Sequence, residues 1–225
     1  MYEALALGFR PPTPETARRL MSSQGVRALA AAAAALDDVW GSTLVSDVGR
    51  LATPDDLESL SASFRRLFGH TARGRVPPYE TEYGDDSLFQ PIQEMAHLAA
   101  FYLAFGLLLA PTSRERIDHV SCECEFLLVL TRKEAYAVER GEQEMLSATT
   151  HAVRIFLRDH LGRWAPPFGL KLAREDREGF YGALGTLCAA FVRQECARLG
   201  VPAGPELLRL RSTASADVPM ACGPP

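Results

Sequence analysis

Apolar residues recur three and four positions apart along almost the whole chain, which is the spacing of one face of an α-helix. A clear example is the stripe formed by Leu57, Leu60, Phe64, Leu67 and Phe68. No segment shows the alternation of apolar and polar residues expected of a half-buried strand, and we find no internal repeat. The pattern therefore predicts an all-α protein whose helices, joined mostly by short connections, pack as a single-domain bundle.

Capping residues, glycines and prolines divide this pattern into separate helices. Thr13 followed by Pro14 is typical of a helix start. The main helices are expected at residues 26–39, 53–68, 87–110, 112–140, 142–160 and 174–199. Two other segments, 69–86 and 161–172, contain adjacent prolines and, respectively, three and two glycines, so we expect a long loop and a connector there.

The chain ends in a segment rich in small residues and proline. Gly200 and Pro202 close the last long helix and separate it from this segment. We assign residues 1–205 to the helical domain and expect residues 206–225 to form a disordered tail, with a short helix near residues 206–210.

The most apolar run, residues 96–110, is shorter than the roughly 17–25 residues that a membrane-spanning helix needs. We therefore interpret it as a buried core helix and expect no membrane insertion. Residues 1–9 lack the basic region of a secretory leader and contain Glu3, which favours a cytoplasmic protein.

Composition narrows the classes of function further. The chain has 225 residues and a formal net charge of −4, so it lacks the strongly basic balance of many nucleic-acid-binding proteins. Its five cysteines are odd in number and sparse, which favours reduced thiols. Cys122 and Cys124 lie two positions apart in a predicted helix and point in divergent directions, so we expect neither a metal site nor a cofactor.

The sequence contains no nucleotide-binding, serine-hydrolase or zinc-protease motif. His119 and Glu123 lie four residues apart, where a helix would bring them together. Such a pair could perform acid–base chemistry, and a helical enzyme or a small-ligand-binding regulator using Asp118, His119 and Glu123 is one hypothesis. An ordinary surface ion pair would have the same spacing.

Two segments stand out from the helical background. In the first, Pro77 and Pro78 stiffen a loop that carries Tyr79, Glu80 and Tyr83. An extended, acidic and aromatic loop of this kind suits a basic, partly apolar peptide, although it could equally pack against the bundle.

The second segment begins the predicted helix at residues 112–140. Its non-apolar face carries Asp118, His119, Glu123 and Glu125. Acidic residues are favoured near a helix start, but that preference does not extend to Glu123 and Glu125. We expect this face to be exposed, so substitution of Asp118 or His119 should change stability by no more than about 0.5 kcal/mol.

At these two segments the chain resembles the TorD/NarJ family of chaperones, which mature molybdenum-cofactor oxidoreductases. The family's P-P-Y-E loop corresponds to residues 77–80, and its E-P-x-D-H motif to residues 115–119, with Arg116 in place of the proline. The stretch EFLLVLTRKEAYA at residues 125–137 also resembles the family, and the similarity extends over residues 1–200.

The resemblance implies a TorD-like helical bundle and a non-enzymatic chaperone. Such a chaperone binds the apo catalytic subunit of one oxidoreductase, through its twin-arginine leader or its mature part, and assists cofactor insertion and proofreading before export. The molybdenum-cofactor insertion machinery is a further implied partner, and both monomers and dimers are compatible with the family. On this basis the client-binding residues are expected to be Tyr79, Glu80, Tyr83, Asp118, His119, Glu123 and Glu125, in two facing walls.

Overall fold

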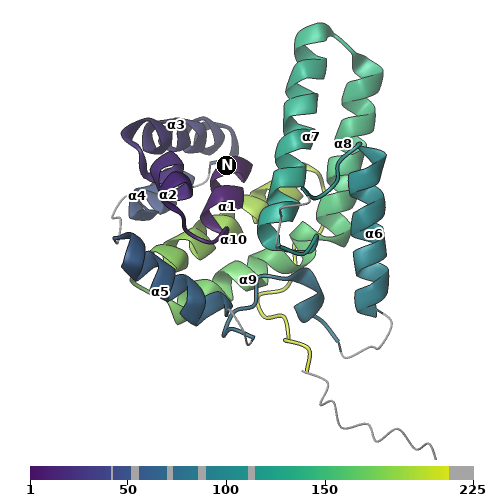
Figure 1. Ribbon diagram of the computed structural model, residues 1–225. Helices are drawn as coiled ribbons and strands as arrows, with labels where there is room; N and C mark the ends of the chain where they lie inside the picture. Colours follow the sequence, from purple (N-terminus) through teal and green to yellow (C-terminus); the bar gives the residue numbers. More distant parts are fainter. Residues whose placement is uncertain (42, 52–55, 70–72, 86–89, 111–114, 213–225) are drawn as a thin grey trace, which may run out of the picture.

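The computed structural model describes the chain except residues 42, 52–55, 70–72, 86–89, 111–114 and 213–225 (Figure 1). The described part forms ten α-helices and one 3₁₀ turn, with no strand element, which confirms the predicted all-α fold. The elements are α1 (Tyr2–Gly8), α2 (Pro14–Met21), α3 (Ser23–Trp40), α4 (Leu44–Leu51), α5 (Leu57–Phe68), η1 (Glu80–Glu82), α6 (Gln90–Ala104), α7 (Val120–Arg140), α8 (Gln143–Asp159), α9 (Leu161–Glu175) and α10 (Phe180–Arg198).

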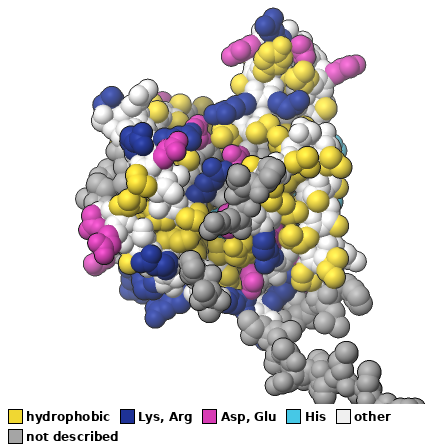
Figure 2. All heavy atoms as spheres, in the orientation of Figure 1, with side chains coloured by type: hydrophobic (Ala, Val, Ile, Leu, Met, Phe, Trp, Pro, Cys, Tyr) yellow, Lys and Arg dark blue, Asp and Glu magenta, His cyan; other side chains and the backbone are white. Residues whose placement is uncertain are grey.

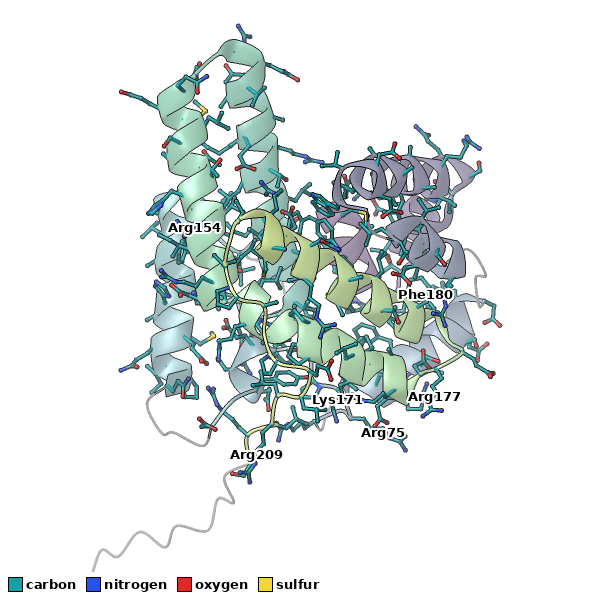
Figure 3. The ribbon with its side chains drawn as sticks, turned by 180° about the vertical axis from the view of Figure 1, so that it is seen from behind. Arg75, Arg154, Lys171, Arg177, Phe180 and Arg209 are labelled. Atoms are coloured by element: carbon teal, nitrogen blue, oxygen red, sulfur yellow. The ribbon has the colours of Figure 1, made fainter. Side chains whose placement is uncertain are left out.

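The helices form one body from which a long hairpin projects. Helices α9 and α10 pack against each other, and α4 and α8 pack against this pair, while α1 lies on α7. Helices α7 and α8 form the projecting hairpin, and α6 stands alongside it (Figure 1). Seen from behind, α9 and α10 cross the molecule below the hairpin, with Phe180 at the start of α10 (Figure 3).

Helix α9 corrects the prediction of an irregular connector at residues 161–172. Pro166 and Pro167 lie inside this helix, although proline lacks the amide hydrogen of a helical hydrogen bond. The carbonyl of Gly162, four residues before Pro166, instead accepts a 2.8 Å hydrogen bond from the amide of Gly204. The segment that follows α10 thus supplies the donor that the proline cannot.

Helix α7 begins later than predicted, at Val120 rather than near residue 112. Glu115, Asp118 and His119 therefore precede the helix, and the predicted capping residue Thr112 lies outside the described residues. Helix α10 likewise begins at Phe180, six residues after the predicted start, whereas the Thr13 cap of α2 is confirmed.

Helix α6 corrects the prediction of a buried core helix at residues 96–110. It ends at Ala104, where Gly106 adopts a left-handed conformation with a φ of 70°, and only Leu98 and Tyr102 are buried within it. No helix in the described ranges is long and apolar enough to cross a membrane.

The predicted short helix near residues 206–210 is absent. Leu210 instead forms an isolated antiparallel bridge with Tyr83, and the amide of Arg211 donates to the carbonyl of Glu82 over 2.9 Å. The contacts of the folded body therefore continue to Arg211, beyond the boundary that we placed at residue 205. The rest of the predicted tail, residues 213–225, lies outside the described part.

Candidate functional site

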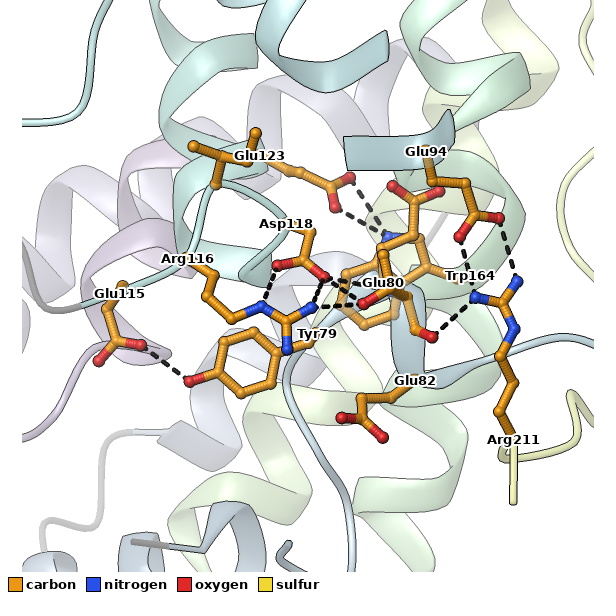
Figure 4. Close-up of polar contacts among 12 residues, drawn as sticks. Tyr79, Glu80, Glu82, Glu94, Glu115, Arg116, Asp118, Glu123, Trp164 and Arg211 are labelled. Atoms are coloured by element: carbon orange, nitrogen blue, oxygen red, sulfur yellow. Dashed lines mark hydrogen bonds and ion pairs between the residues drawn. The ribbon is translucent and has the colours of Figure 1, made fainter. Parts of the chain in front are cut away.

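The two segments singled out in the sequence bind each other directly. The amide of Glu80 donates a hydrogen bond to the carbonyl of Asp118, and the amide of Val120 donates one to the carbonyl of Pro78. Both nitrogen–oxygen distances are 2.9 Å. Tyr79 and His119 form the antiparallel bridge between these two hydrogen bonds. We call the paired residues 78–83 and 115–120 the clasp, because they fasten the loop to the start of α7 (Figure 4).

Asp118 is the polar centre of the clasp. Its carboxylate is fully buried and accepts hydrogen bonds from the amide and the hydroxyl of Thr81, at 3.2 and 2.7 Å. Arg116, which replaces the motif's proline, donates from Nε and Nη2 to both carboxylate oxygens at 3.0 and 2.7 Å. The Arg116 guanidinium also lies 4.7 Å from the centre of the Tyr79 ring, so it ties both clasp segments together.

His119 caps α7. Its Nδ1 atom accepts a 3.1 Å hydrogen bond from the amide of Ser121, which the first turn of the helix leaves unpaired. The Tyr79 ring meets the imidazole edge to face at 5.2 Å. Burial, and then the positive charges of Arg10 and Arg116, lower the pKa of His119 to about 3, so the imidazole is neutral at physiological pH.

Glu80 connects the clasp to the helices below it. Its buried carboxylate forms an ion pair with the Arg163 guanidinium at 2.7 Å and contacts the Nδ1 atom of His160 at 2.9 Å. The other nitrogen of His160 lies 2.9 Å from Nδ1 of His97 on α6. Arg163 also binds Glu94 of α6 at 2.8 Å, so two arginine–glutamate contacts join the loop, α6 and α9.

Glu123 lies deeper than its position near a helix start suggests. Its fully buried carboxylate accepts from the indole nitrogen of Trp164 at 3.1 and 3.2 Å (Figure 4). Burial, and then the charge of Glu80, raise the pKa of Glu123 well above its ordinary value. Glu123 is thus hydrogen-bonded to Trp164 rather than paired with His119, and the predicted surface ion pair is not formed.

The C-terminal segment completes the clasp from the opposite side. Arg211 is buried and donates from Nη1 to the carbonyl of Thr81 at 2.7 Å, while both of its terminal nitrogens contact Glu94 at 3.1 and 3.2 Å. Arg209, two residues earlier, is exposed and points away from the body (Figure 3).

The seven predicted site residues therefore fall into three groups by exposure. Five are buried: Glu80, Tyr83, Asp118, His119 and Glu123. Tyr79 is half-buried, and its hydroxyl donates to Glu115 over 3.1 Å. Glu125 is exposed and binds Arg10 at 2.5 Å. The two predicted walls face each other, but they are in direct contact, so the exposure that we expected of Asp118 and His119 is wrong.

A groove with a volume of about 610 Å³ lies beside the clasp. Its apolar lining comes from the end of α6, the following segment and α7, and includes Tyr102, Leu107, Leu108, Phe126 and Val129. The charges of the groove come from Glu115, Glu125 and Arg10. Cys122 also lines the groove, and these three charges influence the pKa of its thiol. Burial raises the pKa of the Cys122 thiol to about 12, so this group is not a reactive thiolate.

Sequence reasoning found the two clasp motifs but missed most of their partners. Arg163, His160 and Arg211 carry no local signal, because each is far from residues 77–83 in the chain. Within the described residues, no three His, Cys, Asp or Glu side chains are arranged to hold a metal ion.

Comparison with known proteins identifies the class to which this all-α fold belongs. A profile of the nitrate reductase delta subunit family matches residues 23–169. The chaperone TorD of Vibrio parahaemolyticus is 28% identical over 163 residues, which cover 70% of this chain and 72% of that protein. The selenate reductase assembly chaperone of Thauera selenatis is 32% identical over 130 residues, covering 58% of this chain and 62% of that protein.

A structural relative agrees with the assignment of the fold. A redox enzyme maturation protein from Archaeoglobus fulgidus superposes with a TM-score of 0.50 at 18% identity, covering 85% of this chain and 91% of that chain. The chain therefore belongs to the nitrate reductase delta subunit family. The TorD and selenate reductase relatives are named as chaperones, which together with the family match confirms the predicted redox-enzyme maturation chaperone.

Proposed function

We propose that the protein is a cytoplasmic chaperone for the apo catalytic subunit of a molybdenum-cofactor oxidoreductase. It keeps this client available for cofactor insertion and prevents its premature export. The relatives support a client of this kind, since two of them are named as assembly chaperones of selenate reductase and chlorate reductase. The groove beside the clasp is proposed to bind the client's twin-arginine leader.

The chemistry of the groove carries this proposal. A twin-arginine leader presents two guanidinium groups followed by an apolar stretch. The groove offers the carboxylates of Glu115 and Glu125 together with an apolar lining that includes Leu107, Leu108 and Phe126. Carboxylates accept paired hydrogen bonds from guanidinium groups, and an apolar lining favours the first residues of the stretch that follows.

The buried residues of the clasp have an indirect role in this proposal. Asp118 and His119 hold the start of α7, the helix that carries Glu125 and Phe126, against the loop. They therefore position the groove and do not contact the leader. This assignment replaces the direct contacts that we expected of them.

Arg10 allows a test in which two substitutions act in opposite directions. The Arg10 guanidinium already forms an ion pair with the Glu125 carboxylate, so an arginine of the leader must displace Arg10 to bind there. Replacing Glu125 and Glu115 by glutamine should weaken binding of a synthetic peptide, an arginine pair followed by about 12 apolar residues, by three- to tenfold. Replacing Arg10 by glutamine should strengthen it by a few-fold. Fluorescence anisotropy of the labelled peptide measures both effects.

Glu178→Gln is the matched control, because Glu178 is exposed and does not line the groove. A second peptide with glutamines in place of the arginine pair should not distinguish the Glu125 variant from the wild type. Equal affinities of all the variants for the arginine peptide would mean that the groove does not bind the leader.

A further inference from the structure

The outward face of α6 is unusually apolar for a solvent-exposed helix. Ile92 and Leu103 are 68% and 66% exposed, and Ala96 and Ala99 between them are also exposed. Their spacing of four, three and four residues places them along one stripe of the helix. We call these four residues the outer α6 face; hydrophobic side chains extend along this edge of the molecule in Figure 2.

No exposed charge interrupts this stripe. Glu94 is the one charged residue between residues 90 and 110, and its carboxylate is held by Arg163 and Arg211. Contiguous apolar surface of this kind on a soluble protein usually marks an interaction site. The partner that fits such a stripe is itself apolar and uncharged along the length of the contact.

The outer α6 face leads towards the groove. Gly106 closes α6, with its amide donating to the carbonyl of Leu103 over 2.9 Å. The next residues, Leu107 and Leu108, line the groove, and Leu108 is 82% exposed. An apolar surface therefore starts beside the acidic groove and continues along α6.

We propose that the outer α6 face binds the apolar stretch that follows the arginine pair of the leader. This inference rests on the proposed function of the groove and extends it. Acidic residues in the groove and an uncharged apolar stripe along the helix match the order of charges in the leader. The 15 residues of α6 span about 22 Å, and an apolar stretch of about 12–15 residues in a helix spans a similar length.

The test places a charge on the stripe without disturbing the groove. Leu103→Lys and Ile92→Lys should each weaken the arginine–apolar peptide about tenfold, because a lysine must be desolvated when the apolar stretch docks. A peptide whose apolar stretch is replaced by serine should bind wild type and variants equally. Val138→Lys on α7 is the matched control, since Val138 is 63% exposed and lies outside the groove and the stripe.

The outcomes separate this inference from the proposed function. Unchanged affinity of the α6 variants, with weaker binding by the Glu115 and Glu125 variants, would overturn the inference and leave the groove assignment standing. If neither the α6 variants nor the Glu115 and Glu125 variants lost affinity, both the inference and the groove assignment would be overturned. A second copy of this chain is the other possible occupant of the outer α6 face, and sedimentation of each variant tests it. The inference would be overturned if the wild type were a dimer, Leu103→Lys made it a monomer, and the peptide affinity were unchanged. Melting curves and circular dichroism establish that each variant is folded.

Discussion

Replacement of Asp118 by alanine should lower the free energy of unfolding by roughly 1–3 kcal/mol, the cost of leaving a buried polar group without its hydrogen-bond partner. The substitution leaves the buried amide of Thr81 without an acceptor and removes both carboxylate contacts of Arg116. Urea unfolding monitored by circular dichroism measures the change.

The control for this prediction is Glu125→Ala. Glu125 is also a paired acid, but its side chain is 51% exposed, so its loss should cost no more than about 1 kcal/mol. Asp118→Asn should fall between the two, because the amide oxygen still accepts from Thr81 while the charge opposite Arg116 is lost. Equal stability of the Asp118→Ala variant and the wild type would show that the clasp does not support the fold.

Most of the fold could be predicted because its helices carry an amphipathic pattern and clear end signals. Helix α9 could not, since Pro166 and Pro167 are strong local evidence against a helix. The hydrogen bond from Gly204 that compensates the lost donor comes from a segment 38 residues beyond Pro166, the distance from 166 to 204 in the chain. Local propensity was overruled there by a contact between residues far apart in sequence.

The candidate site shows the same limit in a different form. The sequence located both clasp motifs, but a helix starting near residue 112 would have turned Asp118 and His119 towards solvent. In the structure the chain is extended at these residues, and it pairs with the loop before α7 begins. Side chains that a helical pattern places on the surface are consequently buried, and their partners Arg163 and Arg211 could not be inferred from spacing.

Acidification should destabilise the protein through His119. The folded pKa of about 3 lies below the ordinary value of 6.5, because the imidazole is buried away from water and lies near the positive charges of Arg10 and Arg116. Below pH 6.5 His119 binds a proton in the unfolded chain but stays neutral in the folded chain, so the free energy of unfolding falls as the pH drops towards 3. Each pH unit in this window costs up to about 1.4 kcal/mol, which gives a loss of about 2 kcal/mol between pH 7 and pH 5.

His119→Asn separates this titration from the capping role. Asparagine is a preferred capping residue whose side-chain oxygen can accept from the amide of Ser121, but it does not titrate. The loss of about 2 kcal/mol between pH 7 and pH 5 should therefore be absent from this variant, although losing the ring contact with Tyr79 lowers its stability at both pH values. Glu115, whose carboxylate lies 3.7 Å from Nε2 of His119, attracts the proton and is the group that would oppose the effect. Denaturant unfolding of both proteins at pH 7 and pH 5 measures the difference, and parallel losses would show that other groups govern the acid sensitivity.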